Sequence, residues 1–271
     1  MELKDFLKKE NIEIQDIKYP IKKIKETQDY VMLFLDDDKI MISIESYFKY
    51  DVKNLKGLDD NLYEIFKKEE KILKAYRSCL RKLASKDHSI KQIRDHLKRY
   101  DLDIEETDSI INRLINYDLL NDEKYAMNRV SYLQNSSLSN KAILNKLSKE
   151  GIDKDLIKKY IIEDDNREYE KACINALKYS KTIKNKSLNS KKQNILSKLI
   201  SNGFSYENSH RAVEQLHLQK ENENELLIKE YEKAKKKYEK KYSDYDLRQK
   251  IYASLLSKGF MSDDIKKVME V

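Results

Sequence analysis

Glycine, proline and tryptophan are almost absent from this chain. Its 271 residues include 4 glycines, 1 proline and no tryptophan. Proteins rich in β-structure need many turns built on glycine and proline, so this scarcity favours a mostly helical chain. With so few glycines, the sequence also contains no P-loop, glycine-rich phosphate loop or nucleophile elbow.

Cysteines and long apolar runs are scarce as well. The two cysteines, Cys79 and Cys173, form no CxxC pair and stand among apolar neighbours, which is typical of a reducing compartment. The first residues, MELKDFLKKENIEIQD, lack the apolar core of a signal peptide, and no stretch is apolar enough to span a membrane. We therefore expect a cytoplasmic protein.

Charged residues and tyrosine are abundant. Charged residues make up 38% of the chain, the net charge is +7, and there are 19 tyrosines. A basic balance permits an acidic partner, such as nucleic acid or an acidic protein surface, but solvated helix faces account for the charges equally well.

Residues 17–44 show the period of β-strands. YVMLFL (30–35) is a continuous apolar run, and IMISI (40–44) alternates, with Ile40, Ile42 and Ile44 on one face. We expect a small antiparallel β segment within residues 1–59. Because two or three strands are marginal alone, this segment needs a helix to pack on.

From about residue 60 the apolar period becomes helical and stays so to the end. Asp60 is the predicted N-cap of a long helix, NLYEIFKKEEKILKAYRSCLRKLASK, which joins the strand segment to the helical part of the chain.

A helix-and-turn pattern then recurs about every fifty residues. The copies are IRDHLKRYDLD (93–103), ILNKLSKEGID (143–153), ILSKLISNGFS (195–205) and IYASLLSKGFM (251–261). Each has a leucine four residues before a turn residue, which is Asp101 in the first copy and Gly151, Gly203 or Gly259 in the others. A helix that ends in a left-handed residue favours glycine there, and aspartate tolerates that conformation better than most residues.

A leading helix precedes each pair, so each copy predicts three helices. The predicted fold is mainly α: a tandem array of about four three-helix repeats, elongated and curved, after the small β segment. The expected boundaries are 1–59 for the β segment, 60–118 for the linker helix and repeat 1, 119–165 for repeat 2, 166–220 for repeat 3 and 221–271 for repeat 4.

YDLLNDEKYA (117–126) joins the first two repeats. Asn121 is a good N-cap, and Asp122 and Glu123 then occupy the first helical turn, where the helix dipole favours anions. Leu120 and Tyr125 are spaced for a hydrophobic staple. The acids therefore indicate the start of a helix rather than a catalytic cluster.

This stretch, preceded by IINRLINYD and HSIKQIRDHLKRYDLD, resembles the central motif of the RecX family, the regulators of RecA recombinase. Asp118 stands where that family usually has Gly, and Asn121 where it often has Asp. Ser137 to Asn140 replace the family's basic lead with uncharged polar residues. The strand segment and the third and fourth repeats resemble the longer Gram-positive members, so the resemblance covers roughly residues 17–268.

The resemblance implies a regulator without catalytic activity, cofactor or metal. Such proteins bind the RecA nucleoprotein filament along its groove and limit filament extension, ATP hydrolysis and strand exchange, so they regulate DNA repair, homologous recombination and the SOS response. Some members also bind DNA directly. We expect a monomer.

Two clusters of basic residues are the candidate contact sites, for the partner or for nucleic acid. Pairs four residues apart share a helix face in the first cluster, and the second, SKTIKNKSLNSKK (180–192), is a loop-like stretch without an acid. For both clusters an ordinary solvated surface is the alternative. The candidates are Arg77, Arg81, Lys82, Arg94, Lys98 and Arg99 in the first cluster and Lys181, Lys184, Lys186, Lys191 and Lys192 in the second.

Two other interpretations stay open. A basic helical-repeat protein that binds single-stranded or duplex DNA without a recombinase target would have the same charge pattern, and a helical scaffold for another protein would have the same repeats. The lysine- and tyrosine-rich stretch 229–246 either stacks bases or, as its helical spacing favours, adds a tyrosine stripe to a core. The four histidines have no metal-site spacing.

Overall fold

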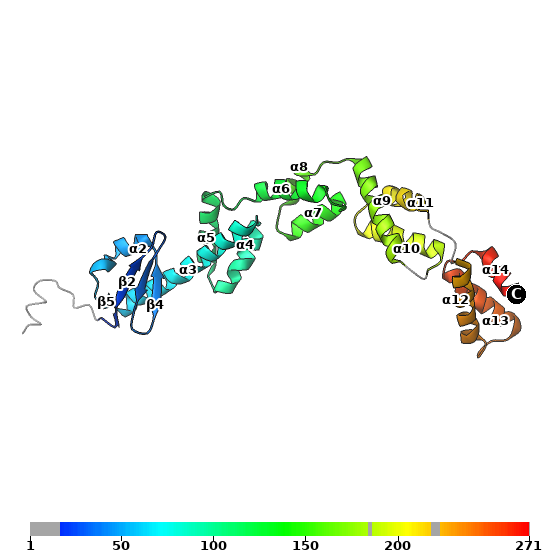
Figure 1. Cartoon of the computed structure of the whole chain (residues 1–271), viewed down its shortest axis with the longest axis horizontal. Helices are drawn as coiled ribbons and strands as arrows, with labels where there is room; N and C mark the ends of the chain where they lie inside the picture. Colours follow the sequence, from blue (N-terminus) through cyan, green and yellow to red (C-terminus); the bar gives the residue numbers. More distant parts are fainter. Residues whose placement is uncertain (1–16, 184–185, 218–222, 271) are drawn as a thin grey trace, which may run out of the picture. The chain divides into compact units, whose positions relative to one another are not determined.

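The computed structural model describes residues 17–183, 186–217 and 223–270 (Figure 1). The contacts divide the chain into two compact units, Met1–Tyr125 and Ala126–Val271. The first unit contains the strands and the pair of helices joined by the turn at Asp101. The second unit contains the helix pairs joined by the turns at Gly151, Gly203 and Gly259. The mainly helical fold with a small antiparallel β segment is therefore confirmed.

The strands form two small antiparallel sheets. One has the order β2 (Lys23–Glu26), β3 (Val31–Phe34) and β4 (Lys39–Ile42), and the other pairs β1 (Tyr19–Pro20) with β5 (Gly57–Leu58). In the larger sheet Val31 lies opposite Ile42 and Leu33 opposite Ile40. These four side chains are buried and start the core of the β segment.

The prediction that Ile44 continues the last strand is wrong. Ile44 begins helix α2 (Ile44–Lys49), and the Ser43 side chain accepts the Ser46 N–H as its N-cap. A serine in this position ends the strand because its hydroxyl offers the backbone a helical start instead. The short 3-10 helix η1 (Val52–Asn54) then leads to β5.

Helix α3 (Asp60–Ser85) is the predicted long helix, and its N-cap is Asp59 rather than Asp60. The Asp59 carboxylate accepts the Leu62 N–H at 2.7 Å. The first half of α3 buries Phe66 against the sheet, and the second half buries Ala75 and Cys79 in the next core. As predicted, one helix joins the strand segment to the helical part.

Two glutamates of α3 also cover the free edge of β4. Glu70 accepts the Met41 N–H at 3.0 Å, and Glu69 accepts the Ser43 N–H at 3.0 Å. Backbone donors at a sheet edge are otherwise unpaired, so α3 satisfies both of them.

The remaining helices come in groups of three along the chain (Figure 1). The second half of α3 packs with α4 and α5, and three groups of three helices follow. Their bounds are α4 (Ile90–Leu97), η2 (Lys98–Tyr100), α5 (Ile104–Asn116); α6 (Asp122–Gln134), α7 (Asn140–Lys149), α8 (Lys154–Tyr160); α9 (Asp165–Thr182), α10 (Leu188–Ser201), α11 (Tyr206–Glu214); and α12 (Glu223–Tyr238), α13 (Asp244–Ser257), α14 (Ser262–Glu270).

All four predicted turn residues are left-handed. Their φ angles are 51° at Asp101, 94° at Gly151, 92° at Gly203 and 82° at Gly259. After each glycine the next residue donates its N–H to the carbonyl five residues earlier: Ile152 to Leu147, Phe204 to Leu199 and Phe260 to Leu255. This is the Schellman ending of a helix, with the apolar residue folded back, so the sequence interpretation of these turns is confirmed.

The junction at residues 117–126 is a capped helix start. Asp118 is left-handed, with φ 54°, and Asn121 Oδ1 accepts the N–H groups of Glu123 and Lys124 at 3.0 and 3.1 Å. The carboxylate of Asp122 has a role that the sequence did not indicate. It accepts the Ile90 N–H at 2.8 Å and so caps helix α4, thirty-two residues earlier in the chain.

Candidate functional site

Arg77 and Arg81 lie one turn apart on α3 and line a pocket of about 340 Å³ in the first unit. Arg113 from α5 and two residues of the β2–β3 loop, Asp29 and Tyr30, line the same pocket. Leu73, Tyr76 and Leu80 of α3 supply its less polar wall. Two of the predicted residues are therefore brought together with an arginine that the sequence interpretation missed.

Tyrosine rings position two of these arginines. The Arg77 guanidinium lies over the Tyr30 ring at 4.5 Å, and the Arg113 guanidinium lies over the Tyr76 ring at 4.5 Å. Stacking of this kind fixes the plane of a guanidinium while its N–H edge stays available to an acceptor. The pocket therefore suits a carboxylate or a phosphate group.

One acid moderates the charge of the pocket. Arg77 Nη1 lies 3.6 Å from Asp29 Oδ2, and the Asp29 side chain is 77% exposed. Among the described residues Arg81 forms no ion pair, so its charge is available to a ligand. Three guanidinium groups against one carboxylate leave the pocket cationic.

The other basic candidates of the first cluster do not line this pocket. Arg94 pairs with Asp108 at 2.6 Å, and Lys98 pairs with Asp95 at 2.6 Å. Lys82 and Arg99 influence the buried His96 instead. Burial is the main cause that lowers the pKa of the His96 imidazole, and the positive charges of Arg99 and Lys82 lower it further. The first cluster thus separates into a pocket and a set of surface charges.

Much of the lysine-rich stretch 180–192 is helical, although its composition predicts a loop. Lys181 belongs to the last turn of α9, and Lys191 and Lys192 belong to α10. Lys192 pairs with Glu214 at 3.2 Å. Lys181, Lys186 and Lys191 form no ion pair within the described part of the chain, and Lys184 lies outside it.

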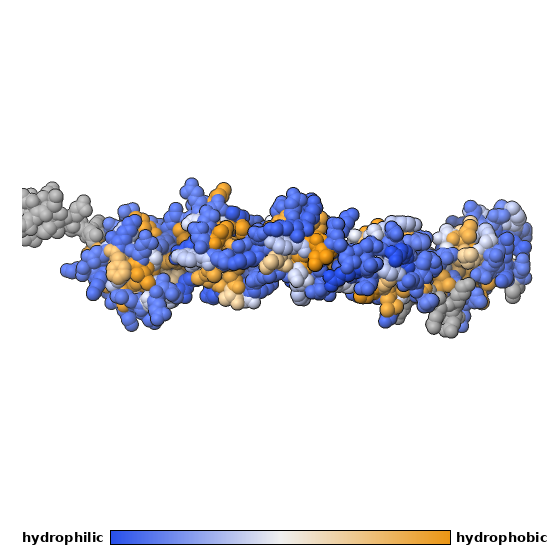
Figure 2. All heavy atoms as spheres, turned by 90° about the horizontal axis from the view of Figure 1, so that it is seen from above, coloured by the Kyte–Doolittle hydropathy of each residue, from blue (hydrophilic) through white to orange (hydrophobic). Residues whose placement is uncertain are grey.

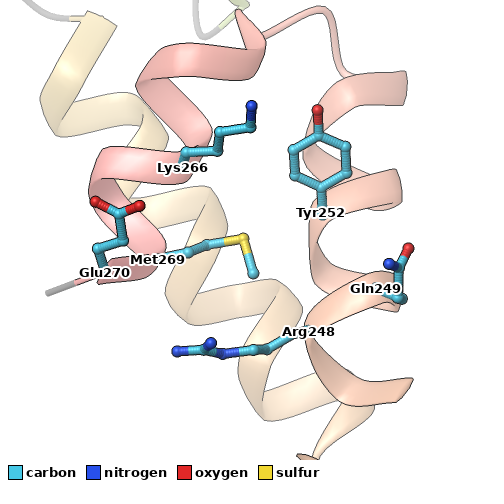
Figure 3. Close-up of a pocket in the computed structure, with 6 residues that line it drawn as sticks. All are labelled: Arg248, Gln249, Tyr252, Lys266, Met269 and Glu270. Atoms are coloured by element: carbon cyan, nitrogen blue, oxygen red, sulfur yellow. The ribbon is translucent and has the colours of Figure 1, made fainter. Parts of the chain in front are cut away.

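A second pocket of about 340 Å³ lies between α13 and α14 (Figure 3). Figure 3 shows Met269 pointing between the two helices and Lys266 pointing toward Tyr252. The residues that line it are Arg248, Gln249, Tyr252, Lys266, Met269 and Glu270. The sequence interpretation missed this pocket because its cations come from two helices and form no run.

The tyrosines of stretch 229–246 divide between core and surface. Tyr231 and Tyr238 pack against the core of the fourth helix group, as their helical spacing predicts. Tyr245 is 72% exposed because α12 ends at Tyr238 and α13 begins only at Asp244. The stripe therefore does not continue beyond α12.

Exposed hydrophobic side chains are scattered over the surface. Most of the face shown in Figure 2 is hydrophilic, with hydrophobic residues gathered in several separate patches. Tyr117, Tyr132 and Tyr206 are among the most exposed. Single exposed side chains of this kind are normal and do not indicate a site by themselves.

Cys79 is buried and lines neither of these two pockets. Burial raises the pKa of the Cys79 thiol to about 11, so this thiol stays protonated and is a poor nucleophile at neutral pH. Among the described residues no three His, Cys, Asp or Glu side chains are grouped as metal ligands. In the same part of the chain, none of the helices has the length and apolarity that crossing a membrane requires.

Family models and known proteins that match this chain all point to one family. Residues 75–114 match the model of the first three-helix domain of RecX, and residues 221–269 match that of its third. "Regulatory protein RecX" of Lactococcus lactis subsp. lactis is 30% identical over 243 residues, which cover 87% of this chain and 90% of that protein. The protein of the same name from Streptococcus uberis is 34% identical over 184 residues, covering 66% of this chain and 70% of that one.

A solved structure of a regulatory protein RecX has a similar fold. It matches with a TM-score of 0.56 and 22% identity over 72% of this chain and 100% of that chain. At this identity the likeness shows the fold alone.

Proposed function

The chain belongs to the RecX family, and from this premise we propose that it regulates the RecA recombinase. It binds the RecA nucleoprotein filament and limits filament extension, ATP hydrolysis and strand exchange. It acts without catalysis, as a monomer in the cytoplasm. The observation that carries the proposal is the similarity to a regulatory RecX protein over 87% of the chain.

The arginine pocket is the proposed contact in the first unit. Two of its guanidinium groups are held by Tyr30 and Tyr76 at 4.5 Å, so they lose little freedom when an anionic group enters. Arg81, which forms no ion pair among the described residues, supplies a charge that no acid of that part of the chain neutralises. A protein carboxylate or a filament phosphate would form paired hydrogen bonds with such groups.

The test is the single-strand-dependent ATP hydrolysis of the cognate RecA, measured with and without this protein. The expected result is a fall in the rate as the protein approaches stoichiometric amounts. An unchanged rate at stoichiometric amounts would contradict the proposal. Direct binding to single-stranded DNA that salt weakens steeply, with no RecA association, would instead favour the DNA-binding alternative.

A variant tests the pocket separately. Replacing Arg77, Arg81 and Arg113 by alanine removes all three guanidinium groups, and inhibition should then require roughly tenfold more protein. Lys22→Ala is the matched control, because Lys22 is an exposed cation of the same unit paired with Asp36 at 3.0 Å. If the triple variant inhibits as well as the control, the contact lies elsewhere.

A further inference from the structure

Two buried serines connect successive helix groups in the second unit. Ser139, the N-cap of α7, accepts the Ala142 N–H at 3.0 Å and donates its hydroxyl to the Asn202 carbonyl at 2.6 Å. Ser187, the N-cap of α10, accepts the Ser190 N–H at 3.3 Å and donates to the Lys258 carbonyl at 2.7 Å. In both cases the carbonyl belongs to the C-cap of the middle helix of the next group. Each serine thus links the start of one middle helix to the end of the following one.

A carboxylate strengthens each link. The Asn140 N–H donates to the Glu168 carboxylate at 3.2 Å, and the Leu188 N–H donates to Glu223 Oε1 at 3.0 Å. Both acids lie in the first turn of the leading helix of the next group. Each therefore satisfies a free N–H at the start of the preceding middle helix, where the dipole also favours an anion.

Glycine makes room for each serine. A Cβ at Gly203 would lie 2.7 Å from Ser139 Oγ, and a Cβ at Gly259 would lie 2.8 Å from Ser187 Oγ. Any other residue at these turns would displace the serine as well as strain the backbone. We call the set of Ser139, Glu168 and Gly203, and the set of Ser187, Glu223 and Gly259, the two joints.

The two joints have the same chemistry at successive boundaries. At each joint a serine hydroxyl bonds the start of one helix and the end of another, a glutamate carboxylate bonds the same helix start, and a glycine leaves room for the serine. Both serines are 1% exposed. Similar contacts at both boundaries favour a similar spacing of the repeats that they join. Regular spacing matters for a partner that is itself periodic, because several repeats then bind together at a high effective concentration.

We propose that the serines and carboxylates of the two joints are positioning residues, which fix the spacing of successive repeats so that these engage successive subunits of a polymeric protein partner. This inference rests on the proposed function for the identity of the partner. The fixed spacing itself belongs to the free protein and is measured without any partner.

The first experiment measures the spacing. Spin labels on Gln193→Cys and Ala253→Cys, both exposed, report the distance between α10 and α13 by electron double resonance, with Cys173 replaced by alanine and the buried Cys79 retained. The unaltered joint should give one narrow distance distribution. Ser187→Ala combined with Glu223→Ala should broaden it at least roughly twofold, because both links at Ser187 and Leu188 are lost.

Two controls separate the joint from general damage. Ser257→Ala removes a hydroxyl whose hydrogen-bond partner among residues 17–183, 186–217 and 223–270 is the Ser254 carbonyl of its own helix, at 2.8 Å, and should leave the distribution narrow. Glu223→Gln keeps an acceptor for the Leu188 N–H and should largely preserve it. Helix content measured on the same samples shows that the variants are folded. A narrow distribution in the folded double variant would overturn the role of the joint.

The second experiment connects spacing to the partner. The double variant should require roughly tenfold more protein than Ser257→Ala to inhibit ATP hydrolysis by the recombinase filament, because fewer repeats bind at once. If the double variant has a broad distribution and inhibits equally well, the positioning role is overturned. If the unaltered protein does not inhibit at all, the proposed function is wrong. The distance measurement then still tests whether the joint fixes the spacing of the repeats.

Discussion

The first helix pair, α4 and α5, and the third, α10 and α11, make the same left-handed turn with different residues. Asp101 has φ 51° and a fully exposed side chain that pairs with Lys71 at 3.6 Å. Gly203 has φ 92° and faces Ser139 of the preceding repeat. A left-handed turn alone therefore admits aspartate, and glycine becomes necessary where another repeat lies against the turn.

The largest expected effect is that of Gly203→Ala. The new Cβ would lie 2.7 Å from Ser139 Oγ and 2.9 Å from Lys141 Cβ, in a backbone conformation that already disfavours alanine. We expect the free energy of unfolding of the second unit to fall by at least about 2 kcal/mol, measured by denaturant titration. Asp101→Ala is the matched change and should cost about 1 kcal/mol or less. Equal losses for the two variants would show that crowding at Gly203 is unimportant.

The next effect concerns how cations are held in the two regions. Arg77 is stacked on Tyr30 in a pocket, whereas Lys186 and Lys191 of the third repeat form no ion pair among the described residues. Arg77→Ala with Arg81→Ala should weaken filament binding roughly fivefold to tenfold, and Lys186→Ala with Lys191→Ala less than about threefold. Binding is measured by the anisotropy of a labelled protein on preformed filaments. A larger loss for the lysine pair would place the contact in the third repeat.

Between about pH 7 and about pH 5, a pH effect from a buried histidine is expected in the first pair. His96 is buried with Nε2 at 2.8 Å from Ser78 Oγ, and burial lowers its pKa below 6.5, as it does for His88. The folded state therefore holds neutral imidazole, while the unfolded chain takes up a proton below pH 6.5. The stability contribution is present above that pH and is lost as the pH falls below it, because only the unfolded chain gains the proton readily.

The exposed histidine of the third pair supplies the control. His210 lies on α11 beside Tyr206 and is exposed. His96→Gln should reduce the loss of stability between about pH 7 and about pH 5, and His210→Gln should not, as measured by thermal unfolding at each pH. An unchanged pH slope in His96→Gln would mean that the fold does not lower the pKa of this imidazole.

The smallest expected effect is that of Asp101→Gly. The turn of the first pair would gain the residue of the other turns, with no serine in need of the space. The strain relieved in the fold and the freedom gained by the unfolded chain oppose each other, so the stability should change by less than about 0.5 kcal/mol. A gain above about 1 kcal/mol in denaturant titration would mean that Asp101 is strained.

Local patterns in the sequence predict the elements that depend on neighbouring residues. The four left-handed turns, the N-cap at Asn121 and the strand at Val31–Phe34 all follow from spacing and residue type. The observed ends of helices and strands differ from the predicted ones in two places. Asp59 and Asp60 compete to cap the same helix, and Ser43 ends a strand early.

Contacts between distant residues were not predictable in this way. Nothing in the order of residues indicates that Asp122 caps α4, that Arg113 joins Arg77, or that Ser139 meets Asn202. Within the uncharged stretch 137–140, the role of the Ser139 hydroxyl becomes visible only in the fold, where it donates to the Asn202 carbonyl. Such contacts depend on how helices pack, and packing is decided by many side chains together.

The glutamates of α3 on strand β4 have a consequence for self-association. At this edge, a new strand from another molecule would have to pair with backbone donors that Glu69 and Glu70 already occupy at 3.0 Å. The opposite edge, β2, carries Lys23 and Lys25, both exposed, and lysine on an edge discourages strand addition. The three-stranded sheet is therefore protected against amyloid-like growth at both of its edges.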